Sequence, residues 1–181
     1  MNDQSLASRV EAWIVDSLLQ FEEFQSANGG KAEVYPGSTA PDGARLIAEL
    51  VGNRHVYACV LFVSDQEIPL DGGESGWDST YLVLVACRNL RPGQARFGMD
   101  DVIDGVVITD KGVNFFRDML RAALHNKHPN QIAYVKDAGG ATIGSFYSDA
   151  TRLAGVRVAF EQKDAYILEA TVIVREVPAA G

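Results

Sequence analysis

Two apolar runs constrain the fold of this chain more than any other feature. They span residues 56–63 (VYACVLFV) and 80–87 (TYLVLVAC). Successive side chains of a strand point to opposite faces of a sheet, so runs of this kind are apolar on both faces. Because each apolar face needs a cover, we predict that residues 56–63 and 80–88 are neighbouring central strands with helices packed on the sheet.

The first and third of three expected helices have the periodicity that suits this role. Residues 5–27 carry apolar side chains three or four positions apart, namely Leu6, Val10, Trp13, Ile14, Leu18, Phe21 and Phe24. Asp110 is expected to cap the third helix, which runs to about Asn126. Its apolar face comprises Val113, Phe116, Leu120, Ala123 and Leu124, with Phe115 and Met119 beside it. We therefore expect both helices to pack on the sheet.

The remaining segments predict one more helix and several strands. The second helix is expected to start at Ser38 or Thr39, with Pro41 in its first turn, and to end at residues 52–53. Its buried face would be Ile47, Leu50 and Val51. Strands are expected at residues 32–35, 132–135, 143–147, 156–160 and 166–174. Residues 64–79 are expected to form a loop too long for a tight hairpin turn, and residues 91–110 to be irregular.

Length and patterning together predict the fold class. The 181 residues contain no internal repeat and no linker-like shift in composition, and this length is near that of one ordinary domain. We therefore predict a single α+β domain over residues 1–181, with a mixed β-sheet and amphipathic helices packed on it.

The charge and the N-terminal sequence exclude several classes of function. The chain has 24 acidic and 16 basic residues and a net charge of −8, which repels the phosphate backbone of nucleic acids. Tight DNA binding is therefore not expected, although DNA can pass through an acidic pore without specific binding. The first residues lack the basic patch and apolar core of a signal peptide, and no apolar run approaches about 20 residues, so we expect production in the cytoplasm and no membrane span.

Two cysteines, Cys59 and Cys87, lie one in each apolar run. Two alternatives follow from this placement. Either both are buried free thiols, or they form a disulfide between adjacent strands.

The glycine-rich and serine-containing segments do not match catalytic motifs. Residues 139–144 (GGATIG) lack the lysine of a phosphate-binding loop and the strand-to-helix context, so they are interpreted as a hairpin loop. Residues 73–77 (GESGW) lack the second glycine of a serine-hydrolase elbow at the required place. We therefore predict no catalytic residue and no organic cofactor.

Three polar groups also fall short of metal sites. His125 and His128 are three residues apart, but no third ligand is evident, and they are interpreted as side chains at the helix end. His55 has no evident partner. Asp100, Asp101 and Asp104 precede a glycine, but Val102 and Lys111 stand where a calcium loop needs oxygen ligands. No metal is therefore predicted.

Two sequence blocks resemble a known family. Residues 82–91 (LVLVACRNLR) place an arginine–asparagine pair at the end of a strand, and residues 112–124 (GVNFFRDMLRAAL) form a helix after a glycine-bearing stretch. Together with the closing hairpin at residues 155–175, they resemble the Mu-like bacteriophage tail terminator (tail completion) proteins.

The resemblance implies a structural role without covalent chemistry. It implies a homo-oligomeric ring, usually a hexamer, that caps the tail tube protein and contacts the head connector protein and, in contractile tails, the tail sheath. DNA would pass through such a ring without specific binding. The protein would then belong to the virion tail and be assembled in the host cytoplasm.

Six residues are candidates for the oligomer or tube interface. They come from the acidic segment 64–79 and the arginine-bearing segment 88–96, and are Asp71, Glu74, Trp77, Arg88, Arg91 and Arg96. The alternative is that the arginines are solvated loop residues and that Trp77 anchors its own loop. A small ligand-binding or regulatory domain is the second functional hypothesis, and an enzyme with a site assembled from distant residues is the third.

Overall fold

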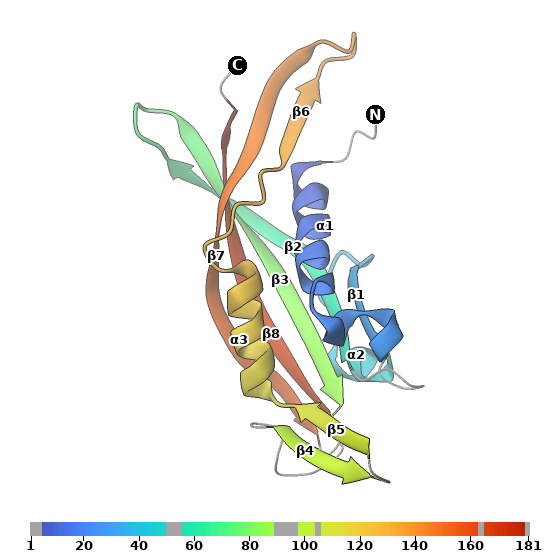
Figure 1. Ribbon diagram of the computed structural model, residues 1–181. Coiled ribbons are helices and arrows are strands. Elements are labelled where there is room, and N and C mark those ends of the chain that lie inside the picture. Colours follow the sequence, from blue (N-terminus) through green and yellow to red (C-terminus); the bar gives the residue numbers. More distant parts are fainter. Residues whose placement is uncertain (1–4, 50–55, 89–97, 104–105, 163–164, 180–181) are drawn as a thin grey trace.

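The computed structural model describes residues 5–49, 56–88, 98–103, 106–162 and 165–179 (Figure 1). Its elements are, in chain order, α1 (Leu6–Leu19), the 3-10 turns η1 (Glu22–Phe24) and η2 (Ser26–Asn28), β1 (Gly30–Val34), α2 (Gly43–Glu49), β2 (Val56–Pro69), β3 (Ser75–Arg88), β4 (Gly98–Ile103), β5 (Val106–Lys111), α3 (Val113–Leu124), β6 (Ile132–Lys136), β7 (Thr142–Gln162) and β8 (Ala165–Pro178). The predicted α+β class is confirmed. Within the described ranges, no helix combines the length and apolar character needed to span a bilayer.

Six strands form one curled sheet in the order β1-β2-β3-β8-β7-β6, and β4 pairs with β5 as a separate hairpin. β1 runs parallel to β2, whereas every other neighbouring pair is antiparallel, so the sheet is mixed as predicted. The register of β2 on β3 runs from Val56 opposite Cys87 to Pro69 opposite Ser75. The predicted pairing of residues 56–63 with residues 80–88 is therefore confirmed.

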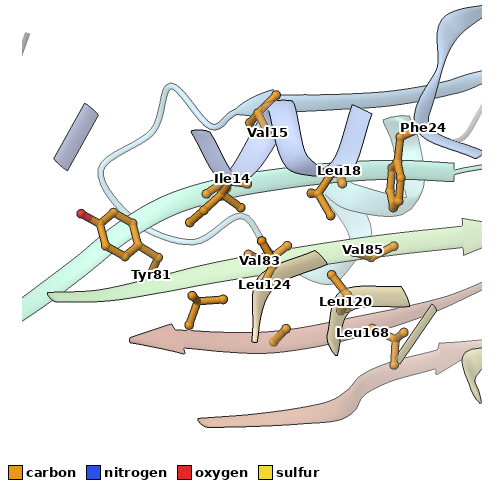
Figure 2. Close-up of a cluster of buried hydrophobic side chains, with 14 of the residues drawn as sticks. Ile14, Val15, Leu18, Phe24, Tyr81, Val83, Val85, Leu120, Leu124 and Leu168 are labelled. Carbon is orange, nitrogen blue, oxygen red and sulfur yellow. The ribbon is translucent and has the colours of Figure 1, made fainter. Parts of the chain in front are cut away.

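One face of the sheet is covered by α1 and α3, as predicted. Ser5 caps α1, because its hydroxyl accepts the N–H of Ser8 at 3.2 Å. Figure 2 shows side chains of both helices directed at the strands beneath them. The fully buried members of this layer include Val10, Ile14, Leu18, Phe116, Leu120, Leu124, Val83, Val85, Val172 and Val174. Burying a side chain of this size contributes about 1.5–3 kcal/mol, so this layer is the main source of stability.

The opposite face has a smaller cover, which α2 provides. Its core consists of Tyr35, Leu46, Tyr57, Cys59, Leu61, Leu84, Ala86, Ala165 and Ile167. Cys59 lies in this layer, whereas Cys87 lies in the layer under α1 and α3. The two cysteines are therefore free and buried on opposite faces of the sheet, which confirms the first of the two alternatives.

Residues 64–79 do not form the long loop that the sequence predicted. They continue β2 and β3 as a ladder from Ser64 opposite Thr80 to Pro69 opposite Ser75. The connection is a tight turn, in which the N–H of Leu70 donates to the carbonyl of Glu74 at 2.9 Å. Gly72 and Gly73 have φ of 88° and 83°, a backbone that glycine adopts without strain. The prediction failed because residues 63–67 of β2 are exposed and need no apolar pattern.

Two further expectations need correction. Residues 143–147 and 156–160 are in strand as predicted, but they are parts of one strand of 21 residues, β7, and not of two. Its register on β8 shifts at three places, and these bulges interrupt the alternation on which the sequence prediction depended. Residues 98–103 and 106–110 are not irregular, since they belong to β4 and β5, which pair from Gly98 opposite Lys111 to Ile103 opposite Val106.

The helix boundaries also differ from the predictions. α1 ends at Leu19 instead of residue 27, because Phe21 is extended and the chain continues as two 3-10 turns. Phe24 nevertheless stays buried, with its ring 6.0 Å from that of Phe116. A Cβ on Gly30 would lie 1.9 Å from the carbonyl oxygen of Glu23, so this close return of the chain requires glycine.

The starts of the other two helices lie later than expected. α2 begins at Gly43 instead of Ser38 or Thr39, and the carboxylate of Asp42 accepts the N–H of Arg45 at 2.7 Å. Leu46 is its buried side chain, with Ile47 packed beside it, while the expected contacts of Leu50 and Val51 and the end at residues 52–53 lie outside the described residues. α3 begins at Val113 after Gly112, because Asp110 belongs to β5 and does not cap the helix.

Candidate assembly surface

The sheet continues as two hairpins beyond the region where both of its faces are covered. We name residues 63–80 the β2–β3 arm and residues 132–147 the β6–β7 arm. Figure 1 shows both arms pointing away from α2 and the β4–β5 hairpin. Residues 63–67 and 71–74 of the first arm and residues 134–143 of the second are exposed. Both arms therefore offer surface to a partner.

The roots of the two arms are joined by an aromatic pair and by the end of β8. The rings of Trp77 and Phe146 meet edge to face, with centroids 5.3 Å apart. Glu176 of β8 lies opposite Trp77 on one side and opposite Ser148 on the other. The direction of each arm is consequently fixed by the same strand.

Carboxylates gather around the buried Tyr81 near these roots. The Tyr81 hydroxyl donates to Glu176 at 3.3 Å, and burial together with the nearby charges of Glu176, Glu11 and Asp65 raises the pKa of Tyr81. Burial also raises the pKa of Glu176, although hydrogen bonds from Ser79 and Tyr81 oppose the shift.

A second carboxylate of this group holds the β2 backbone. The carboxylate of Glu11 in α1 accepts the N–H of Phe62 at 2.7 Å, where the register of β2 shifts. Burial raises the pKa of Glu11, and this hydrogen bond opposes the rise. The contact joins α1 to the start of the β2–β3 arm.

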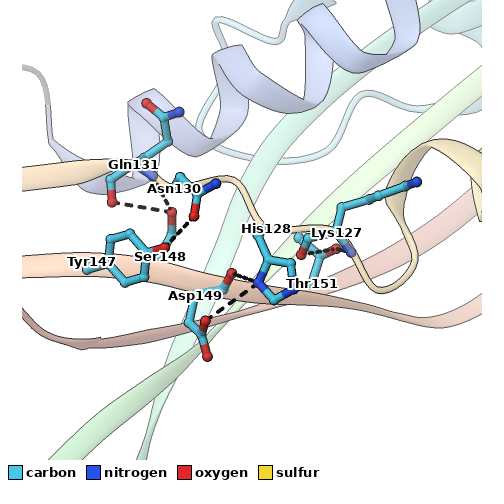
Figure 3. A network of polar contacts seen from close by, with 8 residues as sticks. All are labelled: Lys127, His128, Asn130, Gln131, Tyr147, Ser148, Asp149 and Thr151. Atoms are coloured by element: carbon cyan, nitrogen blue, oxygen red, sulfur yellow. Dashed lines mark hydrogen bonds and ion pairs between the residues drawn. The ribbon is translucent and has the colours of Figure 1, made fainter.

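A polar network fixes the root of the β6–β7 arm (Figure 3). Thr151, which is 2% exposed, donates its hydroxyl to the carbonyl of Leu124 at 2.5 Å and accepts the N–H of Lys127 at 3.0 Å. The fully buried Ser148 accepts the N–H of Gln131 at 2.9 Å through its hydroxyl. These side chains flank the bulge of β7 between residues 148 and 151. They therefore set the path of the chain from α3 into the arm.

The same network includes side chains at the margin of the bulge. The Tyr147 hydroxyl donates to the side-chain carbonyl of Asn130, and one ring nitrogen of His128 lies 2.8 Å from the carbonyl of Asp149. His125 accepts the N–H of Leu153 at 3.2 Å. Both histidines follow the end of α3, so they do not share a helix face, and each contacts β7.

The tip of the β6–β7 arm is a hairpin turn at residues 137–141, as the glycine-rich segment predicted. The carboxylate of Asp137 accepts the N–H groups of Gly139 and Ala141, both at 2.9 Å. Ile143, Tyr134 and Val135 project from the arm and are 67%, 58% and 42% exposed. The sequence predicted strands here but gave no sign that these apolar side chains remain uncovered.

The predicted interface residues lie far apart along β3. Asp71 and Glu74 are at the turn of the β2–β3 arm, and Arg88 is at the other end of β3, about 40 Å away for a strand of this length. Trp77 is half-buried in β3 and does not lie in a loop. Arg91 and Arg96 lie outside the described residues. The structure thus separates the acidic group from Arg88.

The remaining polar candidates are placed as follows. Ser75 is the first residue of β3, and Asp100 and Asp101 belong to β4. Asp104 and His55 lie outside the described residues. Among the described residues, no group of three or more His, Cys, Asp or Glu side chains is arranged to hold a metal ion.

Two grooves border the helical layer. One, of about 690 Å³, lies between the end of α1 with η1 and one face of α3, and its lining residues are Gln20, Phe21, Glu22, Glu23, Phe115, Asp118, Met119 and Ala122. The other, of about 320 Å³, lies between the start of α3 and β7, and includes Asn114, Arg117, Arg157 and Glu161. Sequence periodicity placed Phe21 and Phe115 near the core and did not predict the groove between them.

Comparison with known protein families finds no family that matches this chain, and comparison with curated proteins finds no match either. The fold and the surface define an α+β protein with a covered core and two projecting hairpins. Its functional assignment therefore depends on the sequence resemblance and on the geometry of these surfaces.

Proposed function

We propose that this chain is a structural protein of a bacteriophage tail, a tail terminator that forms a ring on the last ring of the tail tube. The ring would be a hexamer that stops growth of the tube and offers a surface to the head connector protein and, in a contractile tail, to the sheath. No covalent chemistry is part of this function. The acidic balance of the chain suits a passage for DNA that does not bind it.

The observation that supports the proposal most is the separation of two opposite charge groups along β3. A closed ring needs two different surfaces on each subunit, which meet head to tail. Asp71 and Glu74 at one end of β3 and Arg88 at the other are such a pair, and Arg91 and Arg96 follow Arg88 in the chain. Opposite charges on neighbouring subunits would steer association and set its register more than they add affinity.

A ligand-binding domain is the second hypothesis, and the groove beside the start of α3 is where it would apply. Its arginines already have partners in the folded chain. Arg157 lies 2.7 Å from Glu169, and Arg117 lies 3.2 Å from Asp118. The groove is open to solvent and, at about 320 Å³, lies at the lower end of the volumes of ligand sites. These contacts favour the assembly hypothesis.

Images of tails assembled with this protein test the proposal directly. We expect a ring of this chain at the head-proximal end of the tube, and uncapped tubes of irregular length when the chain is omitted. Absence of the protein from that end would show that the terminator hypothesis is wrong.

Charge reversal tests the proposed contact. The double variant Arg91→Glu with Arg96→Glu is expected to weaken ring assembly and to change the free energy of unfolding by less than about 0.5 kcal/mol. Arg152→Glu, on the exposed part of β7, is the matched control and should leave assembly unchanged. Normal rings from the double variant would show that these arginines are not needed for assembly.

A further inference from the structure

The β6–β7 arm carries the two most exposed large hydrophobic side chains of the described residues, Ile143 and Tyr134. Val135 follows Tyr134 on β6, so its side chain points to the other face of the hairpin, whereas Lys136 shares the face of Tyr134. Isolated apolar side chains are common on surfaces, but the two most exposed ones among the described residues lie on one projecting hairpin, which makes it a candidate contact site. The arm therefore has an apolar surface with one adjacent positive charge.

The arm is held in a defined direction before any partner binds. Its tip is closed by the two hydrogen bonds to Asp137, and its root by the network of Ser148 and Thr151. The Trp77–Phe146 pair joins the root to the neighbouring arm. A hairpin that is fixed at both ends loses little conformational freedom on binding, which favours affinity.

The groove between η1 and α3 has the complementary character. Phe21, Phe115 and Met119 form its apolar side, and the carboxylates of Glu22, Glu23 and Asp118 stand around it. Asp118 is paired with Arg117 and Arg121, whereas neither Glu22 nor Glu23 has an ion-pair partner among the described residues. Two carboxylates thus remain beside an apolar groove of about 690 Å³.

We propose that the β6–β7 arm of one copy of this chain docks in the groove between η1 and α3 of a second copy. Ile143 and Tyr134 would contact Phe21, Phe115 and Met119, and Lys136 would face Glu22 and Glu23. Figure 1 shows the arm tip pointing away from η1 and the lower part of α3 of its own chain, so the arm does not reach the groove of its own copy. The inference deepens the proposed function, and rests on it in taking a second copy as the partner.

This contact joins two different surfaces, so it propagates head to tail and can close a ring. The contact also has the same direction as the charged contact proposed along β3. In Figure 1 both arms point one way, whereas the end of β3, which carries Arg88, and the segments η1 and α3 lie toward the other end. Edge-to-edge pairing through β7 is the alternative contact between copies. Three bulges and the exposed Arg152 and Arg157 disfavour it, since bulges and charges prevent strand pairing at a sheet edge.

Cross-linking through engineered cysteines tests the contact in the full chain. A variant with both Thr142→Cys and Ala122→Cys places one thiol on the arm and one in the groove of every copy, and it keeps the proposed contact residues. The native thiols do not interfere, because Cys59 and Cys87 are buried, and burial raises the pKa of Cys59 to about 12. We expect a short thiol-reactive cross-linker to give a ladder of dimers and higher oligomers.

The single variants separate this contact from others. An equal mixture of Thr142→Cys and Ala122→Cys chains should stop at cross-linked dimers, and each single variant alone should give no cross-linked product. Thr142→Cys with Ala154→Cys is the matched control, because Ala154 is also exposed but lies on β7 outside the groove. No ladder from the first pair, or equal products from the control pair, would overturn the proposal.

Charge exchange gives an independent measurement. Lys136→Glu should lower the yield of cross-linked product several-fold, and Glu23→Lys in the partner should restore it, whereas Lys127→Glu should have no effect. Failure of the ladder would refute this contact even if tail images show the ring. A ladder without any protein on tail tubes would instead refute the proposed function and leave the contact in place.

Discussion

The covered half of the sheet and its two arms are built from the same strands but differ in what holds them. Around residues 56–61 and 81–87, side chains from both faces of β2 and β3 are buried under helices. Along residues 63–67 and 134–143 the same backbone pairing continues with exposed side chains. Stability therefore resides in the first region, and surface for a partner in the second.

This comparison shows how an exposed hairpin keeps its direction although no core lies beneath it. The arms depend on backbone ladders and on the groups at their roots, where Trp77 meets Phe146 and where Ser148 and Thr151 are buried. A single substitution can test each of these regions. The effect on the free energy of unfolding should be largest in the core, intermediate at the root of an arm and smallest on the arm itself.

The largest effect is expected in the covered half. Ile167 of β8 is 2% exposed and belongs to the layer under α2. Replacing it, Ile167→Ala, should lower the free energy of unfolding by about 2–5 kcal/mol, because it removes buried methyl groups and leaves a cavity. Urea unfolding measures the change. A loss below about 1 kcal/mol would show that the layer under α2 collapses around the missing side chain or contributes little.

An intermediate effect is expected at the root of the β6–β7 arm. Thr151→Val keeps the shape of the side chain but leaves the N–H of Lys127 without its side-chain acceptor and removes the donor to Leu124. Leaving such groups unpaired in a buried site costs about 1–3 kcal/mol. Thr142→Val, on the exposed arm, is the control and should be nearly neutral. Equal unfolding curves for the two variants would exclude a role for this network.

A smaller effect should follow from pH at the root of both arms. Burial raises the folded-state pKa of Glu176 and of Glu11, so the folded chain binds protons at a higher pH than the unfolded chain. The free energy of unfolding should therefore increase as pH falls through the folded-state pKa values, and stop increasing once the unfolded carboxylates are also protonated.

Unfolding midpoints measured across this range test the sign. Glu176→Gln keeps an acceptor for the Tyr81 hydroxyl and removes the titration, so it should reduce the gain on acidification. The same pH dependence in both proteins would contradict a contribution from Glu176.

The sequence predicted the covered half well because burial leaves a pattern. Residues 56–63 and 80–88 are neighbouring strands, and α1 and α3 lie on them. Leu120 and Phe116 occupy the expected face of α3. Apolar periodicity is produced by a cover, so it identifies the covered elements.

The β6–β7 hairpin was predicted from its two strands and its glycine-rich turn, but the β2–β3 arm could not be predicted in the same way. Asp65, Gln66 and Glu67 form a strand that faces water, and glycines and a proline nearby suggested a loop. The bulges in β7 interrupt the two-residue alternation of side chains, so the sequence pattern does not show that the strand is continuous. Trp77 became a contact for Phe146, a residue distant in the chain, and pairing of that kind is not visible in a single sequence.

The smallest effect on stability should come from Ile143, the counterpart of Ile167 on the arm. Ile143 is 67% exposed, so Ile143→Ala removes few contacts within the chain and should change the free energy of unfolding by less than about 0.5 kcal/mol. If the arm is a contact surface, the same substitution should still reduce association between copies, measured by sedimentation at increasing concentration. If Ile143→Ala weakens association and leaves stability unchanged, the covered half of the sheet serves folding and the arm serves contact between copies. A loss of stability comparable with that of Ile167→Ala would show that the arm belongs to the core.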